Sequence, residues 1–155
     1  CAGRIGSGIG AELGSMKVTE QIDAMEVSAI NPYKYLVVTR ILATTLMLPI
    51  LVIFAHFVGI FGGYIGYNVR GNMSLFRYFS EVVEHLDFLD LIPAVIKTFF
   101  FGFAIGLIGC YKGYYCKKGT AGVGKAANAA VVYTSMLLFV IDFIAVFVTN
   151  IFYKM

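Results

Sequence analysis

Three apolar stretches in this chain are long enough to cross a lipid bilayer as α-helices. They run from about residue 35 to 67, from 92 to 111 and from 126 to 152. Each is near or above the roughly 20 residues that a transmembrane helix needs. Only 14% of the residues are charged, against about 25% in an average soluble domain. The sequence therefore predicts an all-α integral membrane fold with three transmembrane helices.

Local signals predict where helices begin and where they pack closely. Asn31 followed by Pro32 predicts the start of the first span, because asparagine caps free amides and proline fits the first helical turn. The glycine-rich run at residues 6–10 is expected to be the close-packed end of a helix that leaves the membrane. Glycines four residues apart also predict close helix packing within the membrane. They are Gly59 and Gly63, Gly62 and Gly66, and Gly102 and Gly106.

The basic residues predict the orientation of the spans. Arg4, Lys17, Lys34 and Arg40 flank the charged segment near the N-terminus, and Lys112, Lys117, Lys118 and Lys125 flank the second and third spans. Three crossings place both clusters on one side, which the positive-inside rule makes the cytoplasm. The C-terminus at Met155 is then expected outside, together with segment 68–91.

Segment 68–91 is acidic, and its apolar residues recur at helical spacing. The apolar residues are Leu75, Phe76, Phe79, Val82, Val83 and Leu86, and the acidic ones are Glu81, Glu84, Asp87 and Asp90. This pattern predicts an outer amphipathic helix that lies on the membrane or on a partner.

A second charged segment lies near the N-terminus, and it predicts a cytoplasmic helix at about residues 9–29. Its apolar face comprises Leu13, Met16, Ile22, Met25 and Ala29. Its charged residues are Glu12, Lys17, Glu20, Asp23 and Glu26. Helices that rest on lipid favour Lys and Arg, which meet anionic headgroups. Four acids and one lysine therefore favour a protein partner over the alternative, a plain interfacial helix on lipid.

Lys97 and Asp142 are charges at membrane depth, where they are costly and usually functional. Counted from Lys112, Lys97 lies roughly 22 Å into the membrane, and counted from Lys125, Asp142 lies roughly 25 Å in. The two are therefore expected at similar depth in the outer half. We predict that they pair or line one polar cavity. The alternative is that Lys97 extends to the outer surface.

No pattern predicts enzyme chemistry. Residues 119–126 nearly spell a phosphate-binding loop, but Ala126 replaces the hydroxyl residue that would hold magnesium. His56 and His85 are far apart, and the three cysteines lack metal-ligand spacing, so they are read as free thiols. Catalytic residues, metal sites and nucleic-acid binding are accordingly not expected.

Two runs near the N-terminus resemble the signature of the MlaE-type permeases of the Mla/Mce lipid-transport systems. They are Gly3-Arg4-Ile5-Gly6 and Ala11-Glu12-Leu13-Gly14-Ser15-Met16-Lys17-Val18-Thr19-Glu20-Gln21-Ile22-Asp23-Ala24-Met25-Glu26. Asn31-Pro32 matches where the family usually has Asp-Pro, and Gly122, Ala126 and Ala130-Val131-Val132 match near the end. The resemblance covers essentially all 155 residues.

The resemblance implies a permease subunit of an ABC transporter, of which this chain is the C-terminal part. It implies a homodimer on two cytoplasmic ATPases, an MCE-domain protein on the outer side and, in some systems, a STAS-domain subunit. The coupling helix would contact the ATPase through Glu12, Leu13, Met16, Lys17, Glu20 and Asp23. Lys97 and Asp142 match charged residues of the family's lipid cavity. ATP and magnesium would be bound by the ATPase, so the permease needs no cofactor of its own.

We therefore predict a non-enzymatic permease of the bacterial inner membrane, with its C-terminus on the periplasmic side. It would move phospholipids or similar lipids between membranes, driven by a partner ATPase. The alternative is a non-transporting scaffold that anchors a periplasmic lipid-binding protein, which would not need an ATPase-docking helix. The lipid and the direction of transport stay open.

Overall fold

The computed structural model describes residues 2–69, 71, 74–85, 88–117 and 119–154, and the regular structure in these ranges is entirely helical. The elements are α1 (Ala2–Val18), α2 (Gln21–Val27), the π-helical turn η1 (Tyr33–Val38), α3 (Thr39–Asn68), α4 (Leu75–His85), α5 (Phe88–Tyr114) and α6 (Thr120–Lys154). Four residues named in the expectations above lie outside the described ranges, namely Leu86, Asp87, Lys118 and Met155. Cys1, one of the three cysteines, also lies outside them. The predicted all-α class is confirmed.

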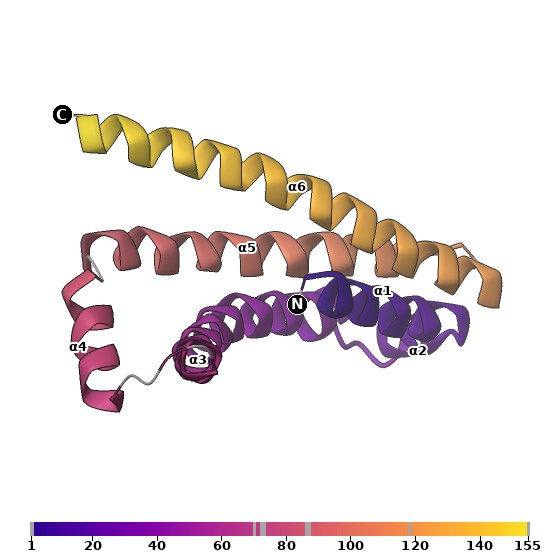
Figure 1. The fold of residues 1–155 in the computed structure, drawn as a ribbon. Helices are drawn as coiled ribbons and strands as arrows, with labels where there is room; N and C mark the ends of the chain where they lie inside the picture. The colour runs from indigo at the N-terminus through magenta and orange to yellow at the C-terminus, as the bar shows by residue number, and fades with distance from the viewer. Residues whose placement is uncertain (1, 70, 72–73, 86–87, 118, 155) are drawn as a thin grey trace.

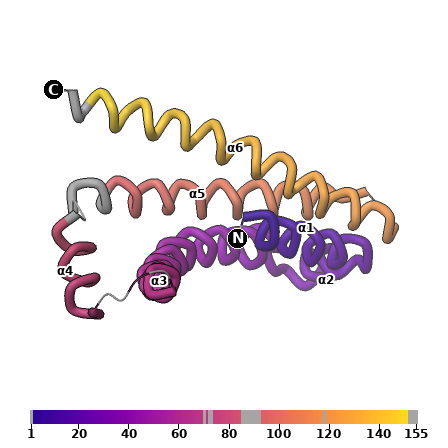
Figure 2. The backbone as a smooth tube through the Cα atoms, viewed as in Figure 1, coloured from indigo at the N-terminus to yellow at the C-terminus, as the bar shows by residue number. Residues whose placement is uncertain are grey.

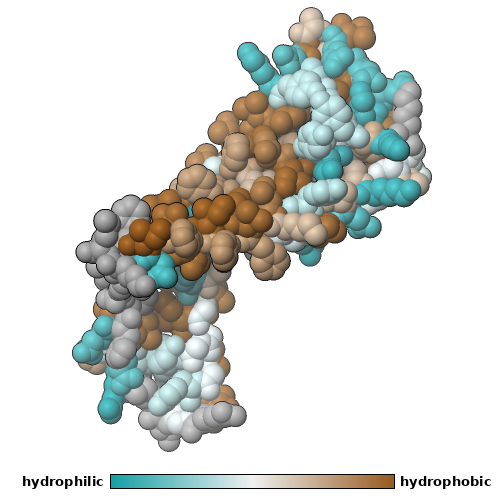
Figure 3. All heavy atoms as spheres, turned by 90° about the horizontal axis from the view of Figure 1, so that it is seen from above, coloured by the Kyte–Doolittle hydropathy of each residue, from teal (hydrophilic) through white to brown (hydrophobic). Residues whose placement is uncertain are grey.

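Three helical stretches are long and apolar enough to span a membrane. They are Tyr33–Asn68, Pro93–Tyr114 and Thr120–Ile151, close to the predicted spans. Figure 3 shows apolar side chains over the middle of the molecule and hydrophilic ones gathered toward its ends. The predicted helix start is also confirmed, since Asn31 Oδ1 accepts hydrogen bonds from the backbone amides of Tyr33 (3.1 Å) and Lys34 (3.4 Å).

The helices form an elongated bundle in which α5 is central. α1 packs against both α5 and α6, and α3 packs against α5. α1 begins midway along the bundle and runs to the end that carries α2 (Figures 1 and 2). Toward the opposite end α6 diverges from α5, and α4 lies there beside the ends of α3 and α5 (Figure 1). We call the α2 end the inner end and the α4 end the outer end, following the orientation predicted from the basic residues.

Glycines on α5 allow two neighbouring helices to approach closely. A Cβ atom at Gly102 would lie 2.6 Å from the Thr44 carbonyl oxygen of α3. A Cβ atom at Gly113 would lie 2.7 Å from the Leu13 Cβ of α1. The close packing predicted for Gly102 and Gly106 is therefore confirmed. Gly59, Gly62 and Gly66 differ, because an added Cβ there meets no atom of the described chain within 4 Å.

The cytoplasmic helix expected at residues 9–29 is two helices in the structure, and the first begins at Ala2. Glu20 adopts a left-handed conformation, with φ of 58°, between α1 and α2. The Ser15 carbonyl accepts both the Thr19 amide and the Thr19 hydroxyl, each at 3.0 Å, and hydroxyl bonding of this kind often bends a helix. Helical periodicity does not reveal the break, because apolar residues on both sides of it face the same core.

That core lies at the inner end. It comprises Leu13, Ile22, Leu36, Cys110 and Tyr114, drawn from α1, α2, η1 and α5. Leu13 and Ile22 are completely buried. The short helix α2 is therefore anchored to the bundle by its own side chains.

At the outer end α4 contacts the end of α3. The Tyr78 hydroxyl donates to the Ile60 carbonyl at 3.3 Å, and the Phe79 ring packs edge-on against Phe61. Phe76 and Val83 stay exposed. A helix therefore lies within segment 68–91, as predicted, whereas its contact with lipid or a partner stays a prediction.

Candidate functional site

The exposed side of α2 forms an acidic tip at the inner end. We define the α2 tip as Glu20, Asp23, Ala24, Glu26 and Val27, all of which are exposed. Val27 is 90% exposed, although it is apolar. A valine surrounded by three acids is unsuited to anionic lipid and suits a contact with protein.

The six residues predicted to contact an ATPase occupy three different environments. Leu13 is buried in the core and Met16 packs against it, so both face the chain's own interior. Glu12 and Lys17 are held in ion pairs with other parts of the chain. Glu20 and Asp23 lie on the α2 tip. Four of the six residues therefore hold the inner end together, and the other two, Glu20 and Asp23, are exposed on the α2 tip.

The two ion pairs connect α1 to its neighbours. Arg40 Nη2 donates to Glu12 Oε1 at 2.6 Å, which joins α3 to α1. Lys17 Nζ donates to Asp23 Oδ1, also at 2.6 Å, which joins α1 to α2 across the break at Glu20. The hydrogen bond to Asp23 raises the pKa of Lys17, so the ammonium is charged at neutral pH.

Val27 was not among the residues predicted from the sequence. The buried face of α2 is set by Ile22 and Met25, and Val27 falls outside that spacing. An apolar residue off the buried face of an amphipathic helix is the signal that would have identified it.

Tyrosines gather at the inner end of the membrane-spanning part. The rings of Tyr33 and Tyr114 lie 4.5 Å apart between centroids, and Tyr115 packs on Tyr114. The Tyr33 and Tyr115 hydroxyls lie 3.3 Å apart, and this hydrogen bond raises the pKa of Tyr115. Such aromatic belts mark membrane–water boundaries. The α2 tip therefore lies on the water side of this boundary.

In the outer half, Lys97 of α5 and Asp142 of α6 form an ion pair. Lys97 Nζ donates to Asp142 Oδ1 at 2.9 Å, and the two side chains are 32% and 50% exposed. Their predicted pairing is confirmed. The pair offsets the cost of placing either charge alone in an apolar environment.

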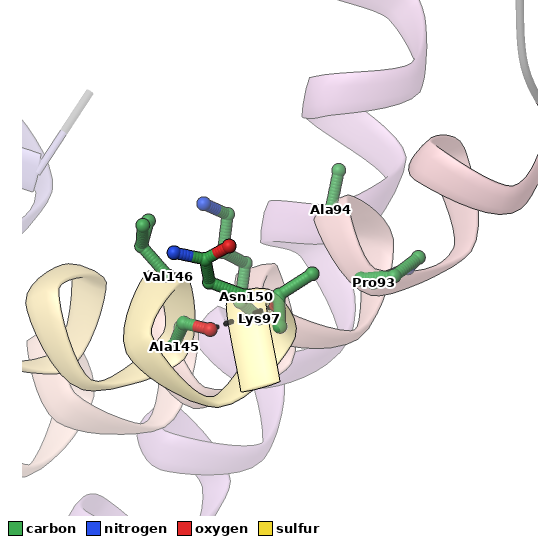
Figure 4. A pocket seen from close by; sticks show the side chains of 7 residues that line it. Pro93, Ala94, Lys97, Ala145, Val146 and Asn150 are labelled. Atoms are coloured by element: carbon green, nitrogen blue, oxygen red, sulfur yellow. Dashed lines mark hydrogen bonds between the residues drawn. The ribbon is translucent and has the colours of Figure 1, made fainter. Parts of the chain in front are cut away.

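Three cavities between α5 and α6 meet at Lys97, with volumes of about 550, 410 and 330 Å³. We call them together the outer groove. Its largest part has apolar walls, formed by Ile96, Phe100, Ile141, Ile144 and Val148. Figure 4 shows the smallest part, which is lined by Pro93, Ala94 and Lys97 from α5 and by Ala145, Val146 and Asn150 from α6. Apolar walls with one ion pair can bind an amphiphile.

The described residues hold no cluster of metal-ligating side chains. His56 Nδ1 lies 2.8 Å from the Val52 carbonyl oxygen one turn earlier on α3, so this imidazole is used within its own helix.

Comparison with known proteins places the chain among membrane permeases. The sequence model of the family described as permease MlaE matches residues 1–148. A probable ABC transporter permease protein of Rickettsia prowazekii is 38% identical over 153 residues, 99% of this chain and 58% of that relative. The chloroplastic protein TRIGALACTOSYLDIACYLGLYCEROL 1 of Arabidopsis thaliana is 34% identical over 143 residues, 92% of this chain and 41% of that relative.

The intermembrane phospholipid transport system permease protein MlaE of Haemophilus influenzae is also similar. It is 32% identical over 145 residues, which are 92% of this chain and 55% of that relative. The chain spans about half the length of the curated relatives it matches. The family match covers the α2 tip and all of the outer groove except Thr149 and Asn150. The chain belongs to the MlaE permease family.

Proposed function

We propose that this chain is part of the transmembrane permease subunit of an ABC transporter that moves phospholipids or similar lipids between membranes. Membership of the MlaE family carries the proposal. The Haemophilus influenzae relative is named for phospholipid transport, and the Rickettsia relative is named as an ABC transporter permease. ATP binding and hydrolysis belong to a partner ATPase, and this chain contributes no catalytic group.

The α2 tip is proposed as the ATPase-docking surface. Its acids and exposed valine lie beyond the tyrosine belt, where a cytoplasmic protein could reach them. Ile22 and the Lys17–Asp23 pair fix α2 to the bundle, so a push on the tip is passed to α1. α1 in turn packs closely against α5 and α6, whose outer ends line the outer groove.

The outer groove is proposed as part of the lipid cavity. Its apolar walls suit acyl chains, and the Lys97–Asp142 pair supplies polar contacts at one place between α5 and α6. ATP-driven movement would change the separation of α5 and α6 and so open or collapse the groove. A homodimer in the bacterial inner membrane, with an MCE-domain protein on the side of the C-terminus and a STAS-domain subunit in some assemblies, completes the proposed transporter.

Charge reversal on the α2 tip tests the docking surface. In Glu20→Lys/Glu26→Lys, two acids of the tip become basic, while Asp23 is left in its bond to Lys17. We expect the full-length complex to lose ATPase co-purification, and lipid-stimulated ATP hydrolysis to fall about tenfold or more, because a mismatched charge at an interface costs several kcal/mol. The control Glu84→Lys reverses an acid on α4, leaves the Arg77–Glu81 ion pair intact and should leave both readouts unchanged.

Two results would count against the proposal. If the tip variant keeps its ATPase and its stimulation, the α2 tip is not the docking surface. If the parent protein retains a periplasmic lipid-binding partner but no ATPase, and transfers no lipid between vesicles, the scaffold alternative holds instead.

A further inference from the structure

A second groove between α5 and α6 lies at the inner end, apart from the outer groove. It has a volume of about 400 Å³, within the range of about 300–1,000 Å³ common for ligand sites. Its walls include Ile108, Tyr111 and Lys112 of α5 and Tyr133, Met136 and Val140 of α6. None of its lining residues lines the outer groove. We call it the inner groove.

Among the described residues, Lys112 is the only charged one that lines the inner groove. Its Nζ lies 3.9 Å from the centroid of the Tyr133 ring and 5.6 Å from that of Tyr111. The two rings hold the ammonium at the mouth of the groove without neutralising its charge. Among the residues that the structure describes, no carboxylate forms an ion pair with Lys112.

The sequence around Lys112 also supplies no acidic residue to balance its positive charge. Between residues 91 and 141 the sequence contains five lysines and no aspartate or glutamate. Among the acids at the inner end, Glu12 pairs with Arg40 and Asp23 pairs with Lys17, whereas Glu20 and Glu26 lie on the exposed α2 tip and do not line the inner groove. The inner groove therefore presents a positive charge that an anion from outside the chain can neutralise.

The position of the groove defines what kind of anion fits. Lys112 lies in the tyrosine belt that marks the membrane boundary, and Met136 and Val140 extend from it along α6 as exposed apolar surface. A ligand that is anionic at the boundary and apolar within the membrane matches both parts. We infer that the inner groove binds one anionic phospholipid of the cytoplasmic leaflet, with its phosphate at Lys112 and an acyl chain along Ile108, Met136 and Val140.

A second copy of this chain fits the groove less well. In a two-fold dimer each surface meets the same surface of its partner. The inner parts of α5 and α6 carry lysines and no acids, so such a contact would bring positive charges together. The site is separate from the proposed transport cavity and does not depend on the proposed function.

Fluorescence quenching can test the inference, because the chain contains no tryptophan. The full chain carrying Met136→Trp is placed in lipid nanodiscs that contain phosphatidylglycerol or phosphatidylcholine with brominated acyl chains. The parent protein supplies the background. Attraction of an anionic headgroup to one interfacial lysine corresponds to a preference of about fivefold. We therefore expect half-maximal quenching at a content of brominated phosphatidylglycerol about fivefold lower than that of brominated phosphatidylcholine.

Four further variants sharpen the test. Met47→Trp places the reporter on α3, where Met47 is 64% exposed against 63% for Met136, and should show no preference between the lipids. Lys112→Gln in the Met136→Trp background should abolish the preference and Lys112→Arg should keep it. Lys117→Gln removes one charge outside the groove and should leave it unchanged. If Met136→Trp does not fold, Val140→Trp places the reporter in the same groove.

Equal quenching by the two lipids would overturn the inference, as would a preference that survives Lys112→Gln. Quenching at Met47→Trp but at neither groove position would also overturn it, because it would mean that protein, either another segment or a second copy, covers the groove.

Discussion

The inner and outer ends of this protein are built differently. At the inner end α1, α2, η1 and α5 converge on a core in which Leu13 and Ile22 are completely buried. At the outer end α6 diverges from α5, and the two are joined across the outer groove by the Lys97–Asp142 pair. Close-packed regions transmit displacement, whereas helices separated by cavities can move relative to each other. The difference suits a device that receives force at one end and changes shape at the other.

The largest effect should come from removing a side chain from the inner core. Leu13→Ala removes a fully buried side chain and should lower the free energy of unfolding by about 2–5 kcal/mol. Leu46→Ala is the matched control, because Leu46 is 58% exposed on α3, and it should cost less than about 0.5 kcal/mol. Denaturant unfolding of the full chain in detergent measures both. Equal losses would mean that the Leu13 side chain is no better packed than an exposed leucine, and that the inner core does not hold this end together.

A smaller effect is expected from adding one methyl group where helices touch. In Gly113→Ala the new Cβ would lie 2.7 Å from Leu13 Cβ and 3.0 Å from the Gly10 carbonyl oxygen, so α1 and α5 must separate. Such overpacking costs about 1–3 kcal/mol. Gly62→Ala meets no atom of the described chain within 4 Å. It should leave thermal stability unchanged or raise it slightly, because alanine favours helix over glycine.

A marked loss of stability in Gly62→Ala would contradict the contrast drawn between α5 and the outer half of α3. It would show that the glycines on α3 also pack against protein, from a partner or from another part of the full-length chain.

The sequence predicted the spans and the Lys97–Asp142 pair because both depend on simple geometry. Hydropathy over about 20 residues identifies a span, and a constant rise per residue gives the depth of a charge. The division of residues 9–29 was not predictable in this way. The left-handed residue at the break is Glu20, whereas glycine is the usual signal for that conformation.

The burial of Leu13 could not be predicted from the sequence either. A stripe of apolar residues has the same spacing whether it faces a partner or the chain's own helices. Only the positions of α5 and η1 show that Leu13 and Met16 face inward, and that the surface left for a partner is the other side of α2.

The smallest effect concerns the contact that joins α5 and α6 at the outer end. Lys97→Gln or Asp142→Asn alone leaves one charge without its partner at membrane depth and should lower the free energy of unfolding by about 1 kcal/mol, because the long Lys97 side chain and the open groove let a lone charge reach polar surroundings. The double variant removes both charges and should cost no more than either single change, about 1 kcal/mol, which corresponds to a coupling of about 1 kcal/mol. A double-mutant cycle in detergent measures the coupling, and additivity within about 0.3 kcal/mol would mean that the pair contributes nothing. A weak coupling of this size agrees with an outer end that can open, because a contact worth about 1 kcal/mol can be broken by forces that would leave the Leu13 core intact.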